Sequence, residues 1–190
     1  MEVRKAVVKD SESIASLLML ATGEVIYRLI GERDFDKARE FLVRFVKSEN
    51  NQYSFQNCFV IEAGGEIIGA LLGYDGDTLH ELRRPVLAYV HRYFDPNLLV
   101  EDETQGGEYY IDSVAVLPVH QGKGIGSLLI SYLINELVNK NGQTVGLLVD
   151  KANPEAKRLY LKLGFESVGE KSLFGMSLEH LQLKPSPSAP

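Results

Sequence analysis

The stretch that decides the fold runs from Tyr109 to Leu137 and reads YYIDSVAVLPVHQGKGIGSLLISYLINEL. Its first part is rich in apolar and β-branched residues, which predicts a buried strand over Ile111–Val116. Its last part predicts a helix, because Leu129, Leu133 and Leu137 recur at the four-residue spacing of a helix face. A glycine-rich turn joins the two elements.

The turn consists of Gln121, Gly122, Lys123, Gly124, Ile125 and Gly126, followed by Ser127. Glycines on alternate positions let the backbone approach a ligand closely, and the first N–H groups of the following helix have no intrahelical partner. Such a turn favours anions, above all phosphates. A dinucleotide-binding turn is the alternative reading of the G-x-G start, but Ser127 replaces the third glycine of that fingerprint and the preceding loop 117–120 is too long for it.

Composition limits the function classes. A chain of 190 residues with 45% hydrophobic and 24% charged residues fits one globular domain. The net charge of −6 and the absence of a basic run argue against nucleic-acid binding. One cysteine, Cys58, excludes an internal disulfide framework. The opening MEVRKAVVKD contains no signal-peptide core and no membrane-spanning length of apolar residues, so we expect a cytoplasmic protein that does not bind membranes.

The rest of the chain predicts alternating strands and helices around this centre. We expect a single domain over residues 1–183 and a disordered tail over 184–190, which is proline-rich. The least regular part, Asp75–Gly107, contains a helical piece interrupted at Pro85 and an acidic cluster, Glu101–Glu103, expected to be a solvated loop. The other expected elements are a strand over Val3–Val8, helices capped by Asp10 or Ser11 and by Asp34, a hairpin turning at Ala63–Glu66, a strand over Thr144–Val149, a helix capped by Asn153, and two strands over Phe165–Lys171 and Leu173–Leu178.

The spacing of Gln121, Gly124 and Gly126 resembles the acyl-CoA signature (Gln/Arg)-x-x-Gly-x-(Gly/Ala) of the GNAT superfamily of N-acetyltransferases. The segment NPEAKRLYLKLGF, which starts at Asn153 and contains Tyr160, is similar to the second hallmark of that family. The two motifs occur in the family's order. The resemblance implies the GNAT fold of a bacterial-type, single-domain member: an α/β (α+β) protein with a mixed sheet of about seven strands, about four helices and splayed central strands.

The same resemblance implies a ligand and its site. Acetyl-CoA would be the co-substrate, with its pyrophosphate on the backbone of residues 121–127. Its pantetheine arm would pair with the splayed strand, where the matching positions are Val114, Ala115 and Val116. Asn153 and Tyr160 would lie beside the thiol, with Tyr160 as the proton donor to the leaving thiolate. No metal is expected, because the four histidines have no ligand spacing with cysteine or carboxylates.

The general base is less clearly indicated. Relatives carry a glutamate at the position of Leu148 or of Tyr110, and this chain has one at neither. Strand alternation places Glu108, Tyr110, Asp112 and Val114 on one face if no bulge intervenes, so Asp112 is the first candidate and Glu108 the second. A purely structural carboxylate at Asp112 is an equal alternative.

The expected function is transfer of an acetyl group from acetyl-CoA to a primary amine of a small molecule or a peptide. A catalytically silent acyl-CoA-binding module is the alternative, and a homodimer is an open possibility. The negative net charge favours a cationic acceptor. The acceptor groove is expected near Tyr27 and Arg33, the Asn50–Tyr53 loop and the Asp75–Gly107 segment.

Overall fold

The fold is built on one mixed sheet of seven strands in the order β1-β2-β3-β4-β5-β7-β6. We describe residues 2–186 of a computed structural model. All neighbouring strands are antiparallel except β4 and β5, which are parallel. The strands are β1 Val3–Lys5, β2 Cys58–Ala63, β3 Glu66–Asp75, β4 Tyr109–Val116, β5 Val145–Asp150, β6 Glu166–Leu173 and β7 Met176–Leu183.

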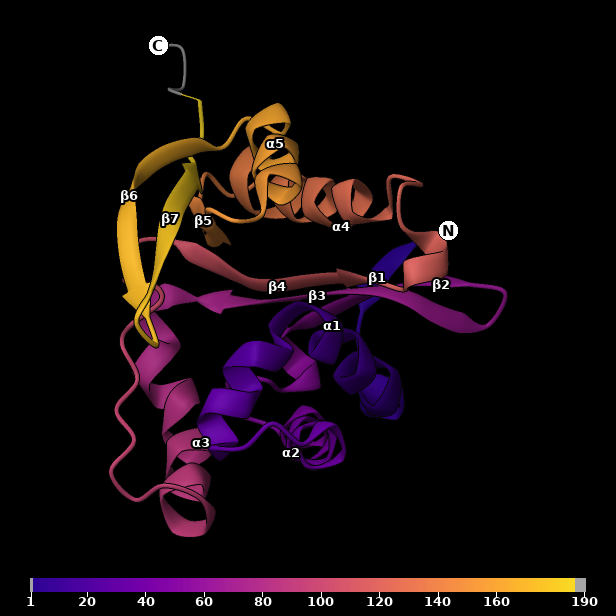
Figure 1. Ribbon diagram of the computed structural model, residues 1–190. Helices are drawn as coiled ribbons and strands as arrows, with labels where there is room; N and C mark the ends of the chain where they lie inside the picture. Colours follow the sequence, from indigo (N-terminus) through magenta and orange to yellow (C-terminus); the bar gives the residue numbers. More distant parts are fainter. Residues whose placement is uncertain (1, 187–190) are drawn as a thin grey trace.

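Helices cover both faces of the sheet, with α1, α2 and α3 on one side and α4 and α5 on the other (Figure 1). The helices are α1 Ser11–Ile30, α2 Phe35–Lys47, α3 Leu79–Tyr93, α4 Ile125–Ile134 and α5 Pro154–Lys162. This arrangement confirms the expected α/β class and the seven strands, with one more helix than predicted. In the predicted tail, residues 184–186 have no regular secondary structure, and residues 187–190 lie outside the described residues.

The additional helix is α3, which continues through the position where the sequence predicted an interruption. Pro85 lies inside α3 and is exposed. Proline removes one backbone donor, which leaves the carbonyl of Glu81 without its usual partner. Because both residues are exposed, that carbonyl can bond water instead. The buried stripe of α3 is therefore intact on the opposite side.

Local signals set most of the other boundaries. The Asp34 carboxylate accepts a hydrogen bond from Lys37 N at 3.0 Å and caps α2 as predicted. The predicted hairpin is confirmed, with β2 and β3 joined through Gly64 and Gly65 at positive φ. Asp10 precedes α1 but does not cap it with its side chain, because its carboxylate accepts hydrogen bonds from Arg4 and from the N–H of Val7.

One helical stretch, Val8–Ile30, is long and apolar enough to cross a membrane by length and composition. Half of its most apolar window is buried inside the protein. Its apolar side chains, such as Ile14, Leu18 and Ile26, belong to the core between α1, α2 and the sheet. A core helix of this kind has the same length and composition as a membrane span, so the hydropathy of α1 is accounted for by packing.

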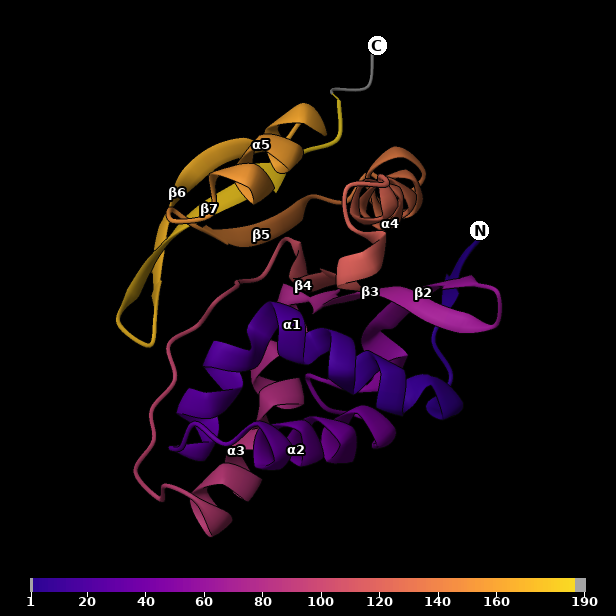
Figure 2. The same cartoon turned by 45° about the vertical axis from the view of Figure 1, so that its right-hand side comes forward.

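The sheet splits beside β4. Only Tyr109, Tyr110 and Ile111 of β4 pair with β5, at Val145, Gly146 and Leu147. Beyond Ile111, β5, β7 and β6 diverge from β4, as Figure 2 shows. On the other edge, Ser113 pairs with Leu72 and Ile111 with Gly73, so Asp112 is the extra residue of a bulge. The predicted splay is thus confirmed.

Candidate active site

The glycine turn between β4 and α4 leaves backbone donors free at a helix start. Gly122 and Gly124 have φ angles of 73° and 79°, where any larger residue would be strained. The first intrahelical hydrogen bond of α4 runs from Leu128 N to Gly124 O at 3.0 Å. The N–H groups of residues 125–127 precede it and can donate to a ligand. Their arrangement is that of a phosphate-binding turn.

The two long side chains of the turn fold back on its own backbone. Gln121 Nε2 donates to Val116 O at 3.1 Å, and Lys123 Nζ donates to Val119 O at 2.8 Å. These contacts join the turn to the last residue of β4 and to the segment that follows it. What the turn offers to a ligand is therefore its backbone, because the side chains serve to hold its shape.

The open edge of β4 lies next to this turn. Val114, Ala115 and Val116 pair with β3 and have no partner in β5. Leu117 N donates to Ile68 O of β3, and backbone groups alternate in direction along a strand, so the N–H groups of Val114 and Val116 point into the gap. The side chains of both valines lie close to Gly126, where an added Cβ would meet them at about 4 Å. Strand edge and turn thus form one continuous backbone surface.

Helix α5 contributes the residues of the second motif. Asn153 caps it, with its Oδ1 accepting from Ala156 N at 3.1 Å. Tyr160 packs edge-on against Phe165, with ring centroids 5.9 Å apart, and burial raises the pKa of its hydroxyl. Burial also holds the pKa of Tyr110 well above its usual value, with smaller contributions from neighbouring acids that include Tyr160. Tyr160 therefore remains a protonated phenol.

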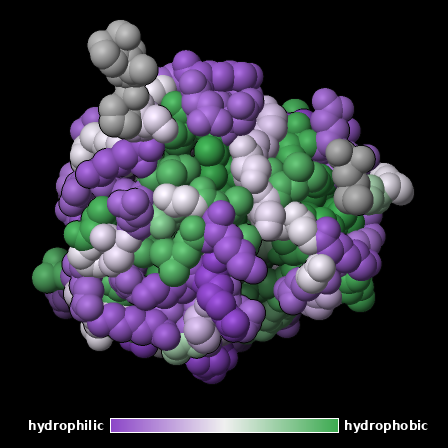
Figure 3. All heavy atoms as spheres, turned by 90° about the horizontal axis from the view of Figure 1, so that it is seen from above, coloured by the Kyte–Doolittle hydropathy of each residue, from purple (hydrophilic) through white to green (hydrophobic). Residues whose placement is uncertain are grey.

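The surface on the α4 and α5 side is mixed in character. Hydrophobic atoms lie exposed between stretches of hydrophilic ones on this face (Figure 3). Leu128 on α4 and Leu161 on α5 are 43% and 46% exposed. A ligand that carries both an apolar arm and charged groups suits such a surface better than a purely ionic one does.

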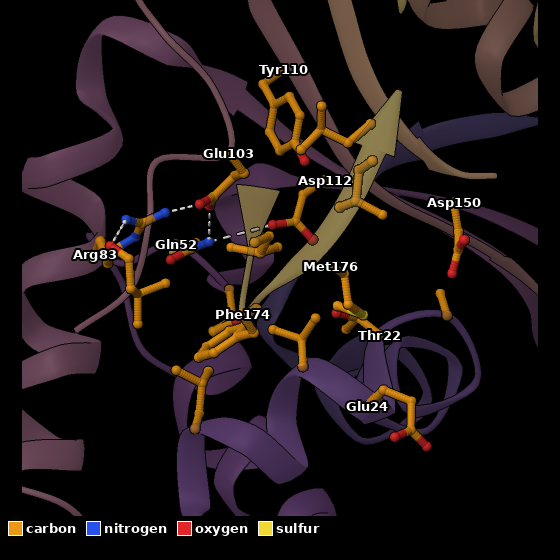
Figure 4. Close-up of a pocket in the computed structure, with 18 of the residues that line it drawn as sticks. Thr22, Glu24, Gln52, Arg83, Glu103, Tyr110, Asp112, Asp150, Phe174 and Met176 are labelled. Atoms are coloured by element: carbon orange, nitrogen blue, oxygen red, sulfur yellow. Dashed lines mark hydrogen bonds and ion pairs between the residues drawn. The ribbon is translucent and has the colours of Figure 1, made fainter. Parts of the chain in front are cut away.

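On the opposite side of the sheet lies a cavity of about 490 Å³, the central cavity. Five parts of the chain line it. They are α1, the loop before β2, α3 with the strap that follows it (residues 95–108), the strands β4 and β5 with the loop after β5 as far as Asn153, and the β6–β7 hairpin. Figure 4 shows Asp112 in its middle, between Tyr110 and Met176. Many lining side chains are apolar: Ala21, Val25, Leu29, Val86, Leu87, Val100, Leu148, Leu173, Phe174, Met176 and Leu178.

Asp112 is the central acid of the cavity. Its Oδ1 accepts from Ser113 Oγ at 2.7 Å, and its Oδ2 lies 3.4 Å from Gln52 Nε2 and 3.3 Å from the Tyr74 hydroxyl. Burial raises the pKa of the Asp112 carboxyl, although these hydrogen bonds oppose the rise. The bulge also breaks the predicted alternation, since Tyr110 and Asp112 face the cavity whereas Val114 faces α4.

Glu108, the second candidate base, lies in a different part of the protein. It is 3% exposed and does not line the central cavity. Its carboxylate accepts from Thr104 Oγ1 at 2.7 Å and Gln182 Nε2 at 2.7 Å, and lies 2.9 Å from His180 Nε2. Burial pushes the pKa of Glu108 upward, but the hydrogen bonds from His180, Gln182 and Thr104 outweigh it and hold the pKa below its usual value. Glu108 thus fastens the strap to β7.

The acidic cluster is a loop with Glu101 and Asp102 exposed, as predicted, but Glu103 is not solvated. Glu103 is 4% exposed and forms an ion pair with Arg83, which is equally buried. Arg83 also binds Asp102 at 3.1 Å, and Gln52 Nε2 donates to Glu103 at 2.7 Å. The prediction was wrong for Glu103 because its partner cation, Arg83, lies on another element, α3. Figure 4 shows this network at one end of the cavity.

The structure also corrects the predicted walls of the acceptor groove. Tyr27 and Arg33 do not line the cavity; Thr22, Glu24 and Val25 of α1 do, together with the β6–β7 hairpin, which the sequence reasoning missed. Gln52 and Tyr53 of the predicted loop and Arg83 of the predicted segment are present. The burial of Arg83 could have been predicted from the sequence, because Arg83 lies on the same helix face as Leu79, Val86 and Val90. Within residues 2–186 no cluster of three metal-ligating side chains occurs, and metal independence stays a prediction.

Comparison with known proteins gives a family match over most of the chain. The model of the acetyltransferase (GNAT) family matches residues 26–165. A [ribosomal protein bS18]-alanine N-acetyltransferase of Haemophilus influenzae is 45% identical over 56 residues, 30% of this chain and 38% of that protein. A mycothiol acetyltransferase of Tsukamurella paurometabola is 43% identical over 67 residues, 35% of this chain and 22% of that protein. The chain thus matches less than half the length of these two curated relatives.

Solved structures share the whole fold. An N-acetyltransferase from Staphylococcus aureus Mu50 superposes with a TM-score of 0.84 at 22% identity, covering 96% of this chain and 100% of the other. The protein yncA from Salmonella typhimurium, solved with its cofactor acetyl-CoA, gives a TM-score of 0.55 at 20% identity, covering 100% of this chain and 96% of the other. At these identities the likeness concerns the fold.

Proposed function

This chain belongs to the acetyltransferase (GNAT) family, and on that premise we propose that it transfers the acetyl group of acetyl-CoA to a primary amine held in the central cavity. The observation that carries the proposal is the position of Asp112. The bulge at this residue turns its carboxylate into the cavity wall, directly before the open edge of β4. A proton acceptor and a backbone surface for the acyl donor therefore adjoin each other.

The residues on the other side of the sheet fit acetyl-CoA. The N–H groups of residues 125–127 suit its diphosphate, and the open edge at Val114 and Val116 suits its amide-containing arm. The ligand supplies an activated acetyl group as a thioester. The chain supplies position, because turn and strand edge fix where the thioester carbonyl lies relative to Asp112.

Proton transfer is the chemical task of the chain. An alkylammonium has a pKa of about 10, so Asp112 must take a proton from the amine, directly or through water, before attack. As the C–N bond forms, the Val114 N–H is placed to donate to the carbonyl oxygen on which charge develops. As the C–S bond breaks, Tyr160 gives its hydroxyl proton to the leaving thiolate, whose conjugate thiol has a pKa near 8.5 in models. The nitrogen of the new amide then loses its excess proton to water, and water reprotonates the Tyr160 phenolate.

The charges around the cavity support a cationic acceptor. Asp112 and Asp150 line it. The Glu24 charge is paired with Arg33, and the Arg83 charge is balanced by its acidic partners. An acidic acceptor would meet repulsion there, while an ammonium group is attracted. One curated relative is named for the alanine of a ribosomal protein, so peptide amines belong in the acceptor panel beside small amines.

The test is thiol release from acetyl-CoA with a panel of amines, comparing the wild type with Asp112→Asn. We expect the substitution to lower kcat by about a hundredfold or more and to leave the Kd for acetyl-CoA unchanged. Asp36→Asn is the matched control, since Asp36 is an exposed carboxylate of α2 that does not line the cavity, and it should change kcat by less than about threefold.

The pH dependence of kcat gives a second test of Asp112 as the base. Because burial raises the pKa of Asp112, wild-type kcat should rise with pH through that raised pKa, and Asp112→Asn should lose this acid limb. A folded-state pKa above the unfolded value contributes stability only at low pH and loses it as pH rises through the folded value. The Tm of Asp112→Asn at neutral pH should therefore not fall. An unchanged kcat with an intact acid limb contradicts the base role, and no turnover with any amine favours a silent acyl-CoA-binding module.

A further inference from the structure

The tip of the β6–β7 hairpin has an unusual residue in its turn. Leu173 pairs with Met176, so Phe174 and Gly175 form a two-residue turn, with φ angles of 49° and 73°. Positive φ at both positions defines a type I′ turn, which prefers Asn-Gly or Gly-Gly. A bulky residue with positive φ is an outlier that strains the backbone. The chain nevertheless has a phenylalanine there.

The turn is held in place from two sides through the backbone of Phe174. Its N–H donates to Glu101 Oε2 of the strap at 2.9 Å, and its carbonyl accepts from Arg28 Nη1 of α1 at 3.1 Å. Ser172 Oγ lies a further 3.4 Å from Glu101 Oε1. These contacts use only main-chain atoms of Phe174, so they would survive a change of its side chain. They leave the purpose of the aromatic ring unexplained.

The ring itself lines the central cavity. Phe174 is half-buried and packs against the core on the α1 side. Figure 4 shows Phe174 and Asp112 on the wall of the same cavity. Val25, Leu29 and Val86 also line this cavity and belong to the same apolar cluster as Phe174. The strained turn therefore aims a large apolar surface into the space that an acceptor would occupy. Observed strain of this kind is a reason to look for function.

We propose that the acceptor is a primary amine with a ring-sized apolar body, and that Phe174 is the residue that selects it. This inference rests on the proposed function. The amine would lie at Asp112 and the apolar body against Phe174, Val25 and Val86. Burying a phenyl-sized group in this part of the cavity would favour such amines over short or polycationic ones, because the energy gained scales with the apolar area removed from water.

The experiment compares 2-phenylethylamine with ethylamine, which carries the same amine without the ring, on the wild type and on Phe174→Asn. Asparagine suits the first position of a type I′ turn, so the variant should fold with an unchanged or higher Tm. We expect the wild type to prefer 2-phenylethylamine by about tenfold or more in kcat/KM. Phe174→Asn should lose about tenfold on that amine and less than about twofold on ethylamine.

Tyr93→Asn serves as a matched control, because Tyr93 is an aromatic residue of α3 that is 56% exposed and does not line the cavity. It should leave both kcat/KM values unchanged. Equal wild-type efficiency on the two amines, or equal losses on both in Phe174→Asn, would overturn the selection by Phe174 while leaving the proposed function standing. No thiol release with any amine would overturn the proposed function and this inference with it.

Discussion

The two sides of the sheet offer ligands different kinds of surface. On the α4 side the proposed site is made of main chain: the turn over residues 121–127 and the open edge of β4. On the α1 side the proposed site is made of side chains that five separate parts of the chain bring together. The first site depends on glycines and strand geometry within one short stretch. The second depends on partners such as Arg83 and Glu103 that only the folded chain places in contact.

This difference explains which properties a family shares. A site of backbone donors tolerates many changes of side chain, so one ligand can be kept throughout a family. A cavity lined by side chains from loops and hairpins changes with each substitution, and the acceptor changes with it. The comparison predicts that damage to either side should leave binding on the other side intact.

The largest effect is expected from Arg83→Met. Removing one partner of a buried ion pair leaves an unpaired charge on Glu103 and costs about 3–5 kcal/mol of folding free energy. We expect Tm to fall by about 10 °C, KM for the acceptor amine to rise, and the Kd for acetyl-CoA, measured on the folded protein in the cold, to stay the same.

Two variants control this experiment. Arg84→Met changes the exposed neighbour and should leave Tm nearly unchanged. Arg83→Met combined with Glu103→Gln removes both charges and should recover part of the lost stability. Weakened acetyl-CoA binding in Arg83→Met would break the comparison, since it would mean that the two sides of the sheet are coupled.

The second effect concerns the backbone site. Gly124→Glu puts a side chain on a residue with a φ of 79° and places negative charge where a phosphate would bind, so calorimetry should record a Kd for acetyl-CoA at least about a hundredfold weaker. Gly31→Glu introduces the same residue at a φ of 72° at the end of α1, on the opposite face of the sheet (Figure 1). It reports the cost of strain alone and should bind acetyl-CoA normally. Undiminished affinity in Gly124→Glu would place the ligand elsewhere.

The smallest effect is expected from Tyr160→Phe, which removes a proton donor and keeps the ring packed against Phe165. Because protonation of the thiolate belongs to the transition state, kcat should fall by about tenfold to a hundredfold while the Kd for acetyl-CoA changes little. Steady-state kinetics beside calorimetry separates the two quantities. An unchanged kcat would make Tyr160 a packing residue.

The sequence predicts the backbone side of the sheet better than the side that is lined by side chains. The turn at Gly124 and the cap at Asn153 were predicted because each depends on neighbours within a few residues. The direction of Asp112 was not, because strict alternation would have put Val114 on its face, and the bulge that prevents this depends on pairing with β3. Glu103 was misjudged because burial of an acid depends on a distant cation.

Phe174 illustrates a third case. Its neighbours Leu173 and Met176 read as an ordinary strand, and Phe-Gly is a weak hairpin signal compared with Asn-Gly. The strain appears only when the φ angle is known, and its meaning only when the cavity beside it is known. A residue that departs from the preference of its turn in order to contact a ligand is missed by rules that use only neighbouring residues.

The strand order has a consequence for how the chain is made. The final strand, β7, lies between β5 and β6 and supplies His180 and Gln182, the partners of Glu108. Both residues leave the ribosome more than seventy positions after the acid that they contact. Until β7 is made, Glu108 lacks these hydrogen-bond partners, and the strap is held by contacts such as those to Arg83 and Gln52. The backbone site can thus take shape on the nascent chain before β7 is made, while the acceptor side is completed only by that strand.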